Sequence, residues 1–376
     1  MLKLRKLFGS GSKAPEITLP VDLLDPGFVA DPHATYAWLR DNAPLAPVKS
    51  GGFVMTRHDD IKAMLSSKAL GNAPSRFSTL HARNAGKYTA ASLAAHIPPF
   101  QDQPDHKLPR QALTRSFHDT FKVFAPTIPD RAAAKIAQVQ TPDRIDLIDD
   151  AAQDFACQTI AAFVGLEATT AQIKSATAAF FRLFAPVQDA AIFEKTNAAL
   201  DDARAMMAAH LTDADDTLVA GLRRFQSDNP ALSQQHIVDN ALLVLADGVE
   251  NIEAGIAQVA MADIQVSEDN VRTVLASQTP AQIIPRVCRE AFSMHGHDVA
   301  VGTPVFLALQ STNAQEPLTF GAGRHSCIGE QLGVAMIAGF ARALQDSGAV
   351  VDASGLHYAP MFGHRWPRGV KVHWPT

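Results

Sequence analysis

The residues with the clearest chemical potential surround Cys327, in the segment Phe320-Gly321-Ala322-Gly323-Arg324-His325-Ser326-Cys327-Ile328-Gly329. Three glycines around one cysteine let the backbone turn sharply and pass close to a flat ligand. A helical pattern follows at once, from Gln331 to Leu344. The helix dipole and the nearby amide donors are expected to lower the thiol pKa and favour a metal-binding thiolate. The alternative is a small cysteine packed beside a glycine turn.

The segment is similar to Phe-Gly-x-Gly-x-His-x-Cys-x-Gly, the heme-binding loop of the cytochrome P450 superfamily. At average residue usage, a chance match in one chain is about one in a million. The resemblance implies that Cys327 is the proximal iron ligand of heme b (iron protoporphyrin IX). It also implies that Phe320 contacts the cofactor and that His325 bonds a heme propionate. In the family, thiolate donation favours O–O cleavage on the other face of the iron.

Two further cationic side chains resemble the family's propionate ligands on a helix. His106 and Arg110 are four residues apart and share a face of a helix that is expected to start at Asp102, its candidate cap, with Pro104 in the first turn. The pair resembles the family's His-x-x-x-Arg, although a solvated helix face is the alternative. Pro109, between them, is expected to displace Arg110.

A strand-like stretch, Ile283 to Val287, contains Arg286. Its position after Pro280 resembles the family's strand after the K helix, whose arginine also binds a propionate. Buried propionates need such cationic donors, because an unpaired charge in the interior is costly.

A long apolar helix is expected after its candidate cap Ser233, over about seven turns, and it carries Asp247-Gly248-Val249-Glu250-Asn251. In the family the equivalent stretch reads small-Gly-x-acid-Thr and crosses the distal face of the heme. The resemblance implies that Gly248 allows a kink and that Glu250 is the acid. Asp247 and Glu250 are the candidate proton carriers, and the alternative is that these acids bind a basic residue. Asn251 replaces the threonine, and its amide does not exchange protons as a hydroxyl does.

Two other features depart from the family. The Glu-x-x-Arg pair of the K helix would fall on Thr273 and Ala276 and is absent, while Glu268 and Arg272 lie nearby with a different spacing. In addition, only fifteen residues, 305–319, separate the turn at 302–304 from Phe320, so most of the family's meander is missing. Electron donors dock near that region in the family.

The elements around these residues indicate a mainly α protein with a small β part. Helical patterns cover 33–42, 59–69, 128–139, 148–164, 170–184 and 196–210, and strand patterns cover 52–56, 283–287, 299–309 and 369–374. The stretch 71–101 has a loop-like composition and is a candidate substrate-binding loop. The resemblance implies a single heme domain over 25–376, after a poorly ordered extension at 1–24. The heme is then expected between the long distal helix and the proximal cysteine loop.

The bulk composition excludes several classes of protein. A net charge of −5 disfavours nucleic-acid coating. Three cysteines form no disulfide framework, and no apolar stretch reaches the ~20 residues of a membrane span, so a cytoplasmic protein without stable membrane insertion is expected.

The resulting hypothesis is a monooxygenase that inserts one atom of O₂ into a small organic substrate, by hydroxylation or oxidative dealkylation. Its electrons would come from a separate donor of the ferredoxin type. Two alternatives keep the heme: a peroxide-driven or non-redox enzyme (peroxygenase, isomerase or dehydratase), and a non-catalytic heme protein that senses or binds a ligand. The substituted Asn251 and the missing meander motivate the first, and the missing Glu-x-x-Arg pair motivates the second.

Overall fold

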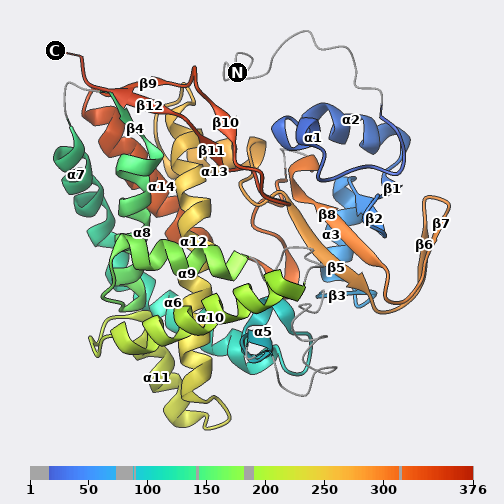
Figure 1. Ribbon diagram of the computed structural model, residues 1–376, viewed down its shortest axis with the longest axis horizontal. Helices are drawn as coiled ribbons and strands as arrows, with labels where there is room; N and C mark the ends of the chain where they lie inside the picture. Colours follow the sequence, from blue (N-terminus) through green and yellow to red (C-terminus); the bar gives the residue numbers. More distant parts are fainter. Residues whose placement is uncertain are drawn as a thin grey trace.

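A computed structural model describes residues 17–72, 88, 90–140, 144–181, 190–312 and 316–375 of the chain. It is mainly helical, with the small sheets gathered at one side and one end of the helices (Figure 1). The predicted fold class is therefore confirmed. No helix among the described residues is long and apolar enough to cross a membrane.

The long helix predicted after Ser233 is α12 (Gln234–Ala260), which runs through the middle of the helical part (Figure 1). Ser233 caps it as predicted, because the Ser233 side chain accepts a hydrogen bond from the His236 amide, while the His236 ring accepts one from the Ser233 amide. Around α12 lie α8 (Gln153–Val164), α9 (Thr170–Phe181) and α14 (Glu330–Asp346). Apolar residues recur on most sides of α12, as expected for a helix enclosed by others.

Among the remaining helices, four lie at or near the predicted patterns 33–42, 59–69, 128–139 and 196–210, whereas the helices at 26–30, 90–96 and 218–228 were not predicted. In chain order the remaining helices are α1 (Pro26–Ala30), α2 (His33–Asn42), α3 (His58–Ser66), α5 (Ala90–His96), α6 (Lys107–Phe124), α7 (Ile128–Val139), α10 (Ala190–His210), α11 (Leu218–Asp228) and α13 (Glu268–Ser277). A π-helical turn, Ile148–Ala152, leads into α8.

The largest sheet has the strand order β1-β2-β8-β5-β3, formed by Leu45–Pro47, Phe53–Met55, Pro304–Ala308, Ile283–Cys288 and Leu70–Asn72. All neighbours are antiparallel except β2 and β8. In this register Arg286 of β5 lies opposite Asn72 of β3 and Val305 of β8. The sheet thereby brings together two segments more than two hundred residues apart in sequence.

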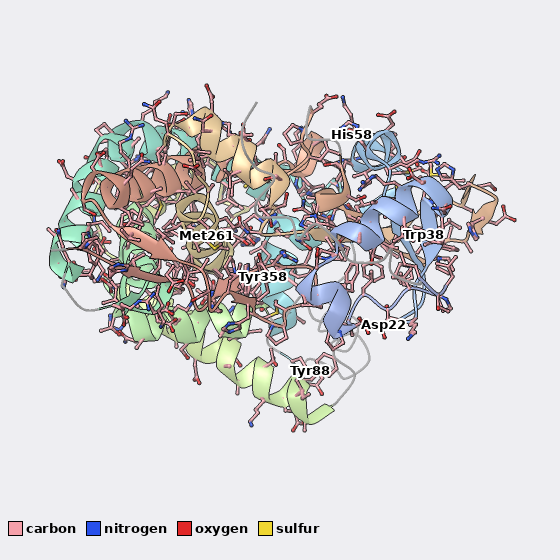
Figure 2. The ribbon with its side chains drawn as sticks, turned by 90° about the horizontal axis from the view of Figure 1, so that it is seen from above. Asp22, Trp38, His58, Tyr88, Met261 and Tyr358 are labelled. Carbon is pink, nitrogen blue, oxygen red and sulfur yellow. The ribbon has the colours of Figure 1, made fainter. Side chains whose placement is uncertain are left out.

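Three smaller sheets complete the β part. One has the order β4-β12-β9 (Ile145–Asp146, Lys371–His373, Val350–Asp352), a second pairs β10 with β11 (His357–Tyr358, Pro367–Arg368), and a hairpin pairs β6 with β7 (Phe292–Met294, His297–Val299). The hairpin projects from the sheet side of the molecule (Figure 1). The labelled side chains of Asp22, Trp38 and His58 lie on that same side, whereas Met261, which follows α12, lies toward the helices (Figure 2).

Two expectations about element boundaries are wrong. The helix expected to start at Asp102 begins at Lys107, because residues before it form turns and Asp102 instead accepts a hydrogen bond from the Asn72 amide at 3.2 Å. With this start Pro109 lies in the first turn, where an amide hydrogen has no helical partner, so the helix tolerates it. The stretch 71–101 is also more ordered than expected, since it contains α5; residues 73–87 and 89 lie outside the described part.

The predicted extension, 1–24, falls mainly outside the described residues. Within the part that is described, Val21 and Leu23 are buried and Val21 donates a backbone hydrogen bond to Pro47. The boundary of a single heme domain over 25–376 stays a prediction.

Candidate heme site

One face of α12 is less buried than the rest of the helix. From Ile237 to Val259 almost every residue of this helix is buried, but Val244, Asp247, Gly248 and Asn251 are not. These four positions follow the spacing i, i+3, i+4 and i+7, which places them on one helix face. This face is called the less buried face of α12 below.

The segment 320–329, called the cysteine loop below, is closed by its own backbone. Cys327 donates its amide hydrogen to the carbonyl of Phe320 at 2.8 Å. Gly321 and Gly323 have φ values of 67° and 71°, in the region that favours glycine. A Cβ atom at Gly329 would lie 3.9 Å from the Cys327 sulfur, so this glycine is next to the sulfur.

The Cys327 thiol is accessible at the surface of its loop but lies among many protein atoms. Its side chain is exposed to a water-sized molecule, yet burial raises the pKa of the thiol to about 12. The Asp247 carboxylate of α12 also contributes to the raised pKa of Cys327, so the two side chains interact electrostatically.

The expectation that the helix terminus lowers the Cys327 pKa is therefore wrong for the protein chain alone. The Gly329 amide lowers that pKa, but burial and the nearby carboxylates outweigh it. α14 begins only at Glu330, three residues after the sulfur. A bound metal ion would supply the missing stabilisation, because it deprotonates a coordinating thiol outright.

The predicted propionate ligands meet at one edge of this loop. The rings of His106 and His325 are 4.2 Å apart, although the two residues come from the start of α6 and from the cysteine loop. His106 is buried and neither ring nitrogen has a hydrogen-bond partner among the described residues. Burial, followed by the positive field of His106, Arg286, Arg110 and Arg324, lowers the pKa of His325 to about 3.

Arg110 and Arg286 carry the positive charge of this group, called the cationic cluster below, because the lowered pKa of His325 keeps its ring neutral near pH 7. Arg110 donates to the Ser326 carbonyl at 2.6 Å, which places its guanidinium directly beside the cysteine loop, so Pro109 does not displace it. Arg286 donates only to its own neighbour, the Pro285 carbonyl, at 3.0 Å among the described residues. Burial lowers the pKa of Arg286 to about 10, with a smaller opposing effect of Asp102.

These residues fit a heme. The accessible thiol of Cys327 can ligate iron. Four side chains gather at the edge of the loop: His106, Arg110, Arg286 and His325. Among the described residues, no carboxylate forms a hydrogen bond with them, so an anionic group is needed to balance their charge. The propionates of heme supply such a group.

Sequence reasoning missed two members of the cluster. Asn72 donates its amide to the Gln101 carbonyl at 2.6 Å and lies 3.2 Å from the His325 ring nitrogen, so it orients that ring. Arg324 adds positive charge to both His106 and His325. Arg324 stands inside the recognised motif and could have been noticed there, whereas Asn72 carries no signal, because only strand pairing brings it to this place.

Glu250 lies away from the less buried face of α12. Its carboxylate accepts hydrogen bonds from Lys174 at 3.0 Å and Thr177 at 2.7 Å, both on α9. Lys174 also binds Glu253 at 2.9 Å, and Arg368 lies 3.7 Å from Glu253. For Glu250 the structure therefore shows the alternative given above, in which the acid binds a basic residue.

Gly248 serves helix packing in this structure. A Cβ atom at Gly248 would lie 2.7 Å from Cδ1 of Ile160, so glycine allows α8 to approach α12 closely. The helix continues without interruption through this position.

Other contacts hold the proximal side, where the Glu-x-x-Arg pair is missing. Arg272 of α13 forms an ion pair with Glu330, the first residue of α14. The buried Gln310 accepts a hydrogen bond from the Thr279 amide at 2.5 Å and donates to the Ser277 carbonyl at 2.9 Å. These contacts attach the end of α13 to the segments on either side of the shortened connection.

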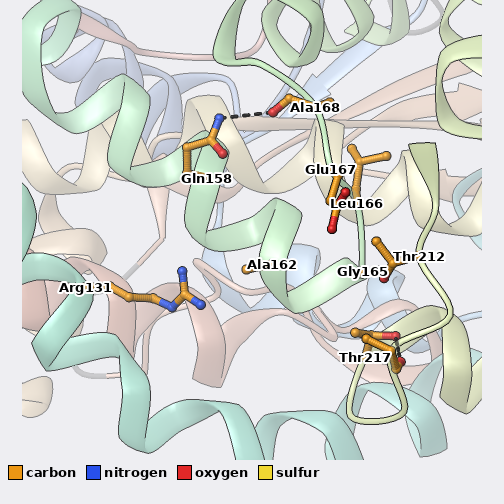
Figure 3. A pocket seen from close by; sticks show the side chains of 10 residues that line it. Arg131, Gln158, Ala162, Gly165, Leu166, Glu167, Ala168, Thr212 and Thr217 are labelled. Atoms are coloured by element: carbon orange, nitrogen blue, oxygen red, sulfur yellow. Dashed lines mark hydrogen bonds between the residues drawn. The ribbon is translucent and has the colours of Figure 1, made fainter.

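A separate hollow at the end of α8 contains none of the predicted site residues. Its walls include Arg131, Gln158, Gly165 and Thr217, and Gln158 donates a hydrogen bond to the Ala168 carbonyl there (Figure 3). None of the residues that resemble the family's heme ligands therefore lines this hollow.

Comparisons with known proteins agree with this reading. No family model matches the chain. The chain is 24% identical over 350 residues to a steroid C26-monooxygenase of Mycobacterium tuberculosis, covering 83% of this chain and 85% of the relative. It is 22% identical over 365 residues to a putative cytochrome P450 133B1 of Xylella fastidiosa, with coverages of 83% and 87%.

Solved structures share the fold over almost the whole chain. CalO2 superposes with a TM-score of 0.81 at 17% identity, covering 95% of this chain and 99% of CalO2. P450BioI, in complex with an acyl carrier protein bearing hexadec-9Z-enoic acid, gives 0.78 at 19%, with coverages of 93% and 99%. The myxobacterial CYP267B1 in complex with myristic acid gives 0.79 at 20%, with coverages of 94% and 99%.

The chain has the fold of cytochrome P450 structures over almost its whole length, and it resembles two proteins named as a monooxygenase and a cytochrome P450. This likeness fits heme as the cofactor and an oxidoreductase as the enzyme class.

Proposed function

We propose that this chain is a heme-thiolate monooxygenase in which Cys327 ligates the iron. The reaction inserts one oxygen atom from O₂ into a small organic substrate, as a hydroxylation or an oxidative dealkylation. The observation that carries this proposal is the cationic cluster that gathers beside the loop bearing the accessible thiol of Cys327. Bound heme supplies the redox chemistry, while the protein sets access, orientation and proton supply.

The cationic cluster holds the cofactor in this proposal. His106, Arg110, Arg286 and His325 bind the propionates, and Phe320 packs beside the heme. Two of these groups, His106 and Arg286, have no hydrogen-bond partner outside their own segment among the described residues. They are therefore free to form charge-assisted bonds.

On the distal side, Asp247 is the residue best placed to hold a proton. Burial, and then the charge of Glu250, raises the pKa of Asp247 to about 6, so the carboxyl exchanges protons near neutral pH. Glu250 lies behind it in the bond network with Lys174 and Thr177. Asn251 and Gly248 shape the helix face but carry no exchangeable acid.

The electron donor in this proposal is a ferredoxin-type protein. A shallow depression beside the cysteine loop is lined by Arg110, Gln111, Thr114, Arg115 and Phe225. Its positive charge suits an acidic partner. A cytoplasmic location, where such donors occur, is part of the same proposal.

A second candidate is a peroxide-driven oxygenase, with a non-redox heme enzyme in the same class. The observation in its favour is Asn251, which occupies the position of the family's threonine and offers no hydroxyl to relay protons. A non-catalytic heme protein that binds or senses a ligand is the third candidate.

The first experiment tests the ligand. Reduced holoprotein with carbon monoxide should absorb at the long-wavelength Soret position that is specific for a thiolate ligand, and Cys327→Ala should abolish this band. Cys157→Ala and Cys288→Ala are the matched controls and should retain it, since both thiols are buried in other packing clusters. A spectrum typical of histidine ligation in the unmodified protein would refute the proposal.

The second experiment separates the three functions. Substrates found by their spin-state shift are assayed with a ferredoxin and its reductase, and separately with hydrogen peroxide. Product in the ferredoxin assay supports the monooxygenase, and product with peroxide alone supports the peroxygenase. Tight binding without product from either system supports the non-catalytic protein.

A further inference from the structure

Arg365 is a buried arginine in the connection between β10 and β11, and it is only 7% exposed. Its Nη1 atom donates a hydrogen bond to the Ala30 carbonyl at 2.7 Å, and the guanidinium carbon lies 3.7 Å from the centre of the Tyr358 ring. Among the described residues, Nε and Nη2 form no hydrogen bond, and no carboxylate pairs with this side chain. A buried guanidinium without an anion is unfavourable.

The two unbonded nitrogens lie on one edge of the guanidinium, called the Arg365 edge below. On this edge the Nε–H and one Nη2–H point in parallel. Such a fork matches the two oxygen atoms of a carboxylate, which binds it through two parallel, charge-assisted hydrogen bonds. A single carbonyl or hydroxyl oxygen offers no second atom to match the fork. The Arg365 edge therefore favours a planar carboxylate.

A buried phenol lies beside the same segment of the chain. Tyr36 is 1% exposed, and its hydroxyl has no hydrogen-bond partner among the described residues. Its ring lies 5.4 Å from the ring of Phe28, which is two residues before Ala30. Burial raises the pKa of the Tyr36 hydroxyl and the charge of Arg365 opposes that rise, in agreement with this proximity. The hydroxyl is thus a second unused donor near the Arg365 edge.

No acid in the described part of the chain bonds to either donor. Asp31, which follows Ala30, is exposed, and its carboxylate accepts a hydrogen bond from the His33 amide at 3.2 Å. The other neighbours are apolar, since Phe28 and Phe362 are partly buried against the core cluster that contains Tyr36. An organic acid with an apolar part suits these surroundings better than a hydrated inorganic anion.

The side chains of segment 364–366 point to two sides. His364 and Trp366 each contact the Phe181 ring of α9, with ring centres 5.4 and 5.0 Å apart. Arg365, between them, reaches the end of α1 instead. β10 contacts α1 as well, and Tyr358 lies where the helical part meets the sheet side (Figure 2). None of these contacts of Arg365 involves the cysteine loop.

We infer that the Arg365 edge and the Tyr36 hydroxyl form a binding site for the carboxylate of a small organic acid. The site goes beyond the proposed function, because none of its residues belongs to the proposed heme site. The carboxylate is carried either by the substrate itself or by a second small molecule, and the experiment below distinguishes these two sources.

The test compares organic acids with their neutral amides on the holoprotein. The pairs are hexanoate with hexanamide, and 4-phenylbutanoate with 4-phenylbutanamide, at about pH 7.5, where both acids are ionised. Each amide keeps the shape of its acid but carries no charge. Binding is measured by calorimetry, and the spin-state shift is recorded in a parallel titration.

The unmodified holoprotein is expected to bind at least one acid about ten-fold tighter than its amide. Arg365→Met should abolish that preference, whereas Arg365→Lys should keep part of it, because an ammonium retains the charge but not the fork. Tyr36→Phe should weaken acid binding about three-fold without lowering the free energy of unfolding, since the hydroxyl has no partner in the described chain. Arg57→Met is the matched control and should change nothing, because Arg57 is exposed and bonded to the Arg40 carbonyl at 2.9 Å.

Three results would overturn the inference. The first is equal binding of acid and amide in both pairs, including no binding at all. The second is a preference that survives in Arg365→Met or, if that variant does not fold, an acid affinity that is unchanged in Tyr36→Phe. The third is a preference that appears only in Asp31→Asn, since Asp31 would then be the counter-ion of Arg365.

The spin-state shift identifies the source of the carboxylate. A shift that Arg365→Met removes assigns the carboxylate to the substrate, whereas calorimetric binding without a shift assigns it to a second molecule. The carbon monoxide spectrum of the same samples keeps this inference distinct from the proposed function. An intact thiolate spectrum without acid preference refutes only the carboxylate site, and a missing thiolate spectrum refutes only the heme-thiolate site.

Discussion

Trp366 donates its indole hydrogen to the side-chain oxygen of Asn251 at 3.3 Å. The other end of the same amide donates to the Asp247 carbonyl at 2.8 Å, one turn earlier in α12. Both ends of the Asn251 side chain are therefore engaged within the protein. This arrangement links α12 to the C-terminal segment, where Trp366 packs against Phe181 of α9.

The engaged amide predicts a structural effect for Asn251→Ala. Loss of the two hydrogen bonds should lower the free energy of unfolding by about 1 kcal/mol. The amount of product formed per electron pair consumed should change by less than about two-fold, since the amide does not carry protons. The measurements are urea unfolding of the holoprotein and product formed per electron pair. A large loss of product at unchanged stability would instead assign a proton-relay role to Asn251.

Arg286 is expected to stabilise the protein with heme bound and to destabilise the protein without heme. Its guanidinium is mostly buried and has no carboxylate bonded to it among the described residues, which lowers its pKa to about 10. Arg286→Met should therefore speed heme transfer to apomyoglobin by about ten-fold, because one charge-assisted bond is lost. The apoprotein should be equally stable or more stable, since an unpaired buried charge is removed.

Arg289→Met is the control for that substitution. Arg289 lies three residues after Arg286, just beyond the end of β5, pairs with Asp102 at 3.3 Å, and is half exposed. Its substitution should change heme transfer much less. If both variants release heme equally fast, Arg286 has no specific part in binding the propionates.

Asp239 should make the protein sensitive to acid. Its carboxylate is fully buried, and the hydrogen bonds from His96 and Arg204, with the charge of Arg204, hold its pKa below the ordinary 3.8 in spite of burial. A folded-state pKa below the unfolded value contributes stability that is present above pH 3.8 and is lost as the pH falls through the folded pKa.

Asp239→Asn should therefore cost about 3 kcal/mol at pH 7, where the ion pair is broken, and much less near pH 3. Urea unfolding at pH 7, 5, 4 and 3 measures the difference between the two proteins. The idea fails if the two stability curves stay parallel over this range.

Gln310 is expected to provide part of the stability that the K-helix ion pair provides in the family. Its substitution by alanine leaves the amide of Thr279 and the carbonyl of Ser277 without this partner in a buried region. Gln310→Ala should lower the free energy of unfolding by about 1–3 kcal/mol. Gln345→Ala, which removes one hydrogen bond from an exposed side chain to the Ile264 carbonyl, should have a smaller effect. If both substitutions lower the free energy of unfolding equally, the two hydrogen bonds of Gln310 contribute no more than an ordinary surface hydrogen bond.

Several local features could be predicted because their causes lie within a few residues of sequence. Ser233 caps α12 through contacts three residues away, and the glycines at 321 and 323 adopt the backbone conformations that only glycine takes easily. The start of α6 was predicted wrongly, because Asp102 has a partner in β3 that local sequence does not reveal. The roles of the site residues remain predictions until the experiments above are made.

The sequence by itself determined the cysteine loop, the mainly α architecture and the cationic residues, since motif spacing and apolar periodicity are local properties. Only the tertiary structure decided how α12 is rotated, because packing against α8 and α9 selects which side of a buried helix stays uncovered. That rotation directs Glu250 to Lys174 and leaves Asp247 on the less buried face of the helix. Tertiary burial also set the thiol pKa, because desolvation depends on all surrounding segments and outweighs the adjacent helix terminus.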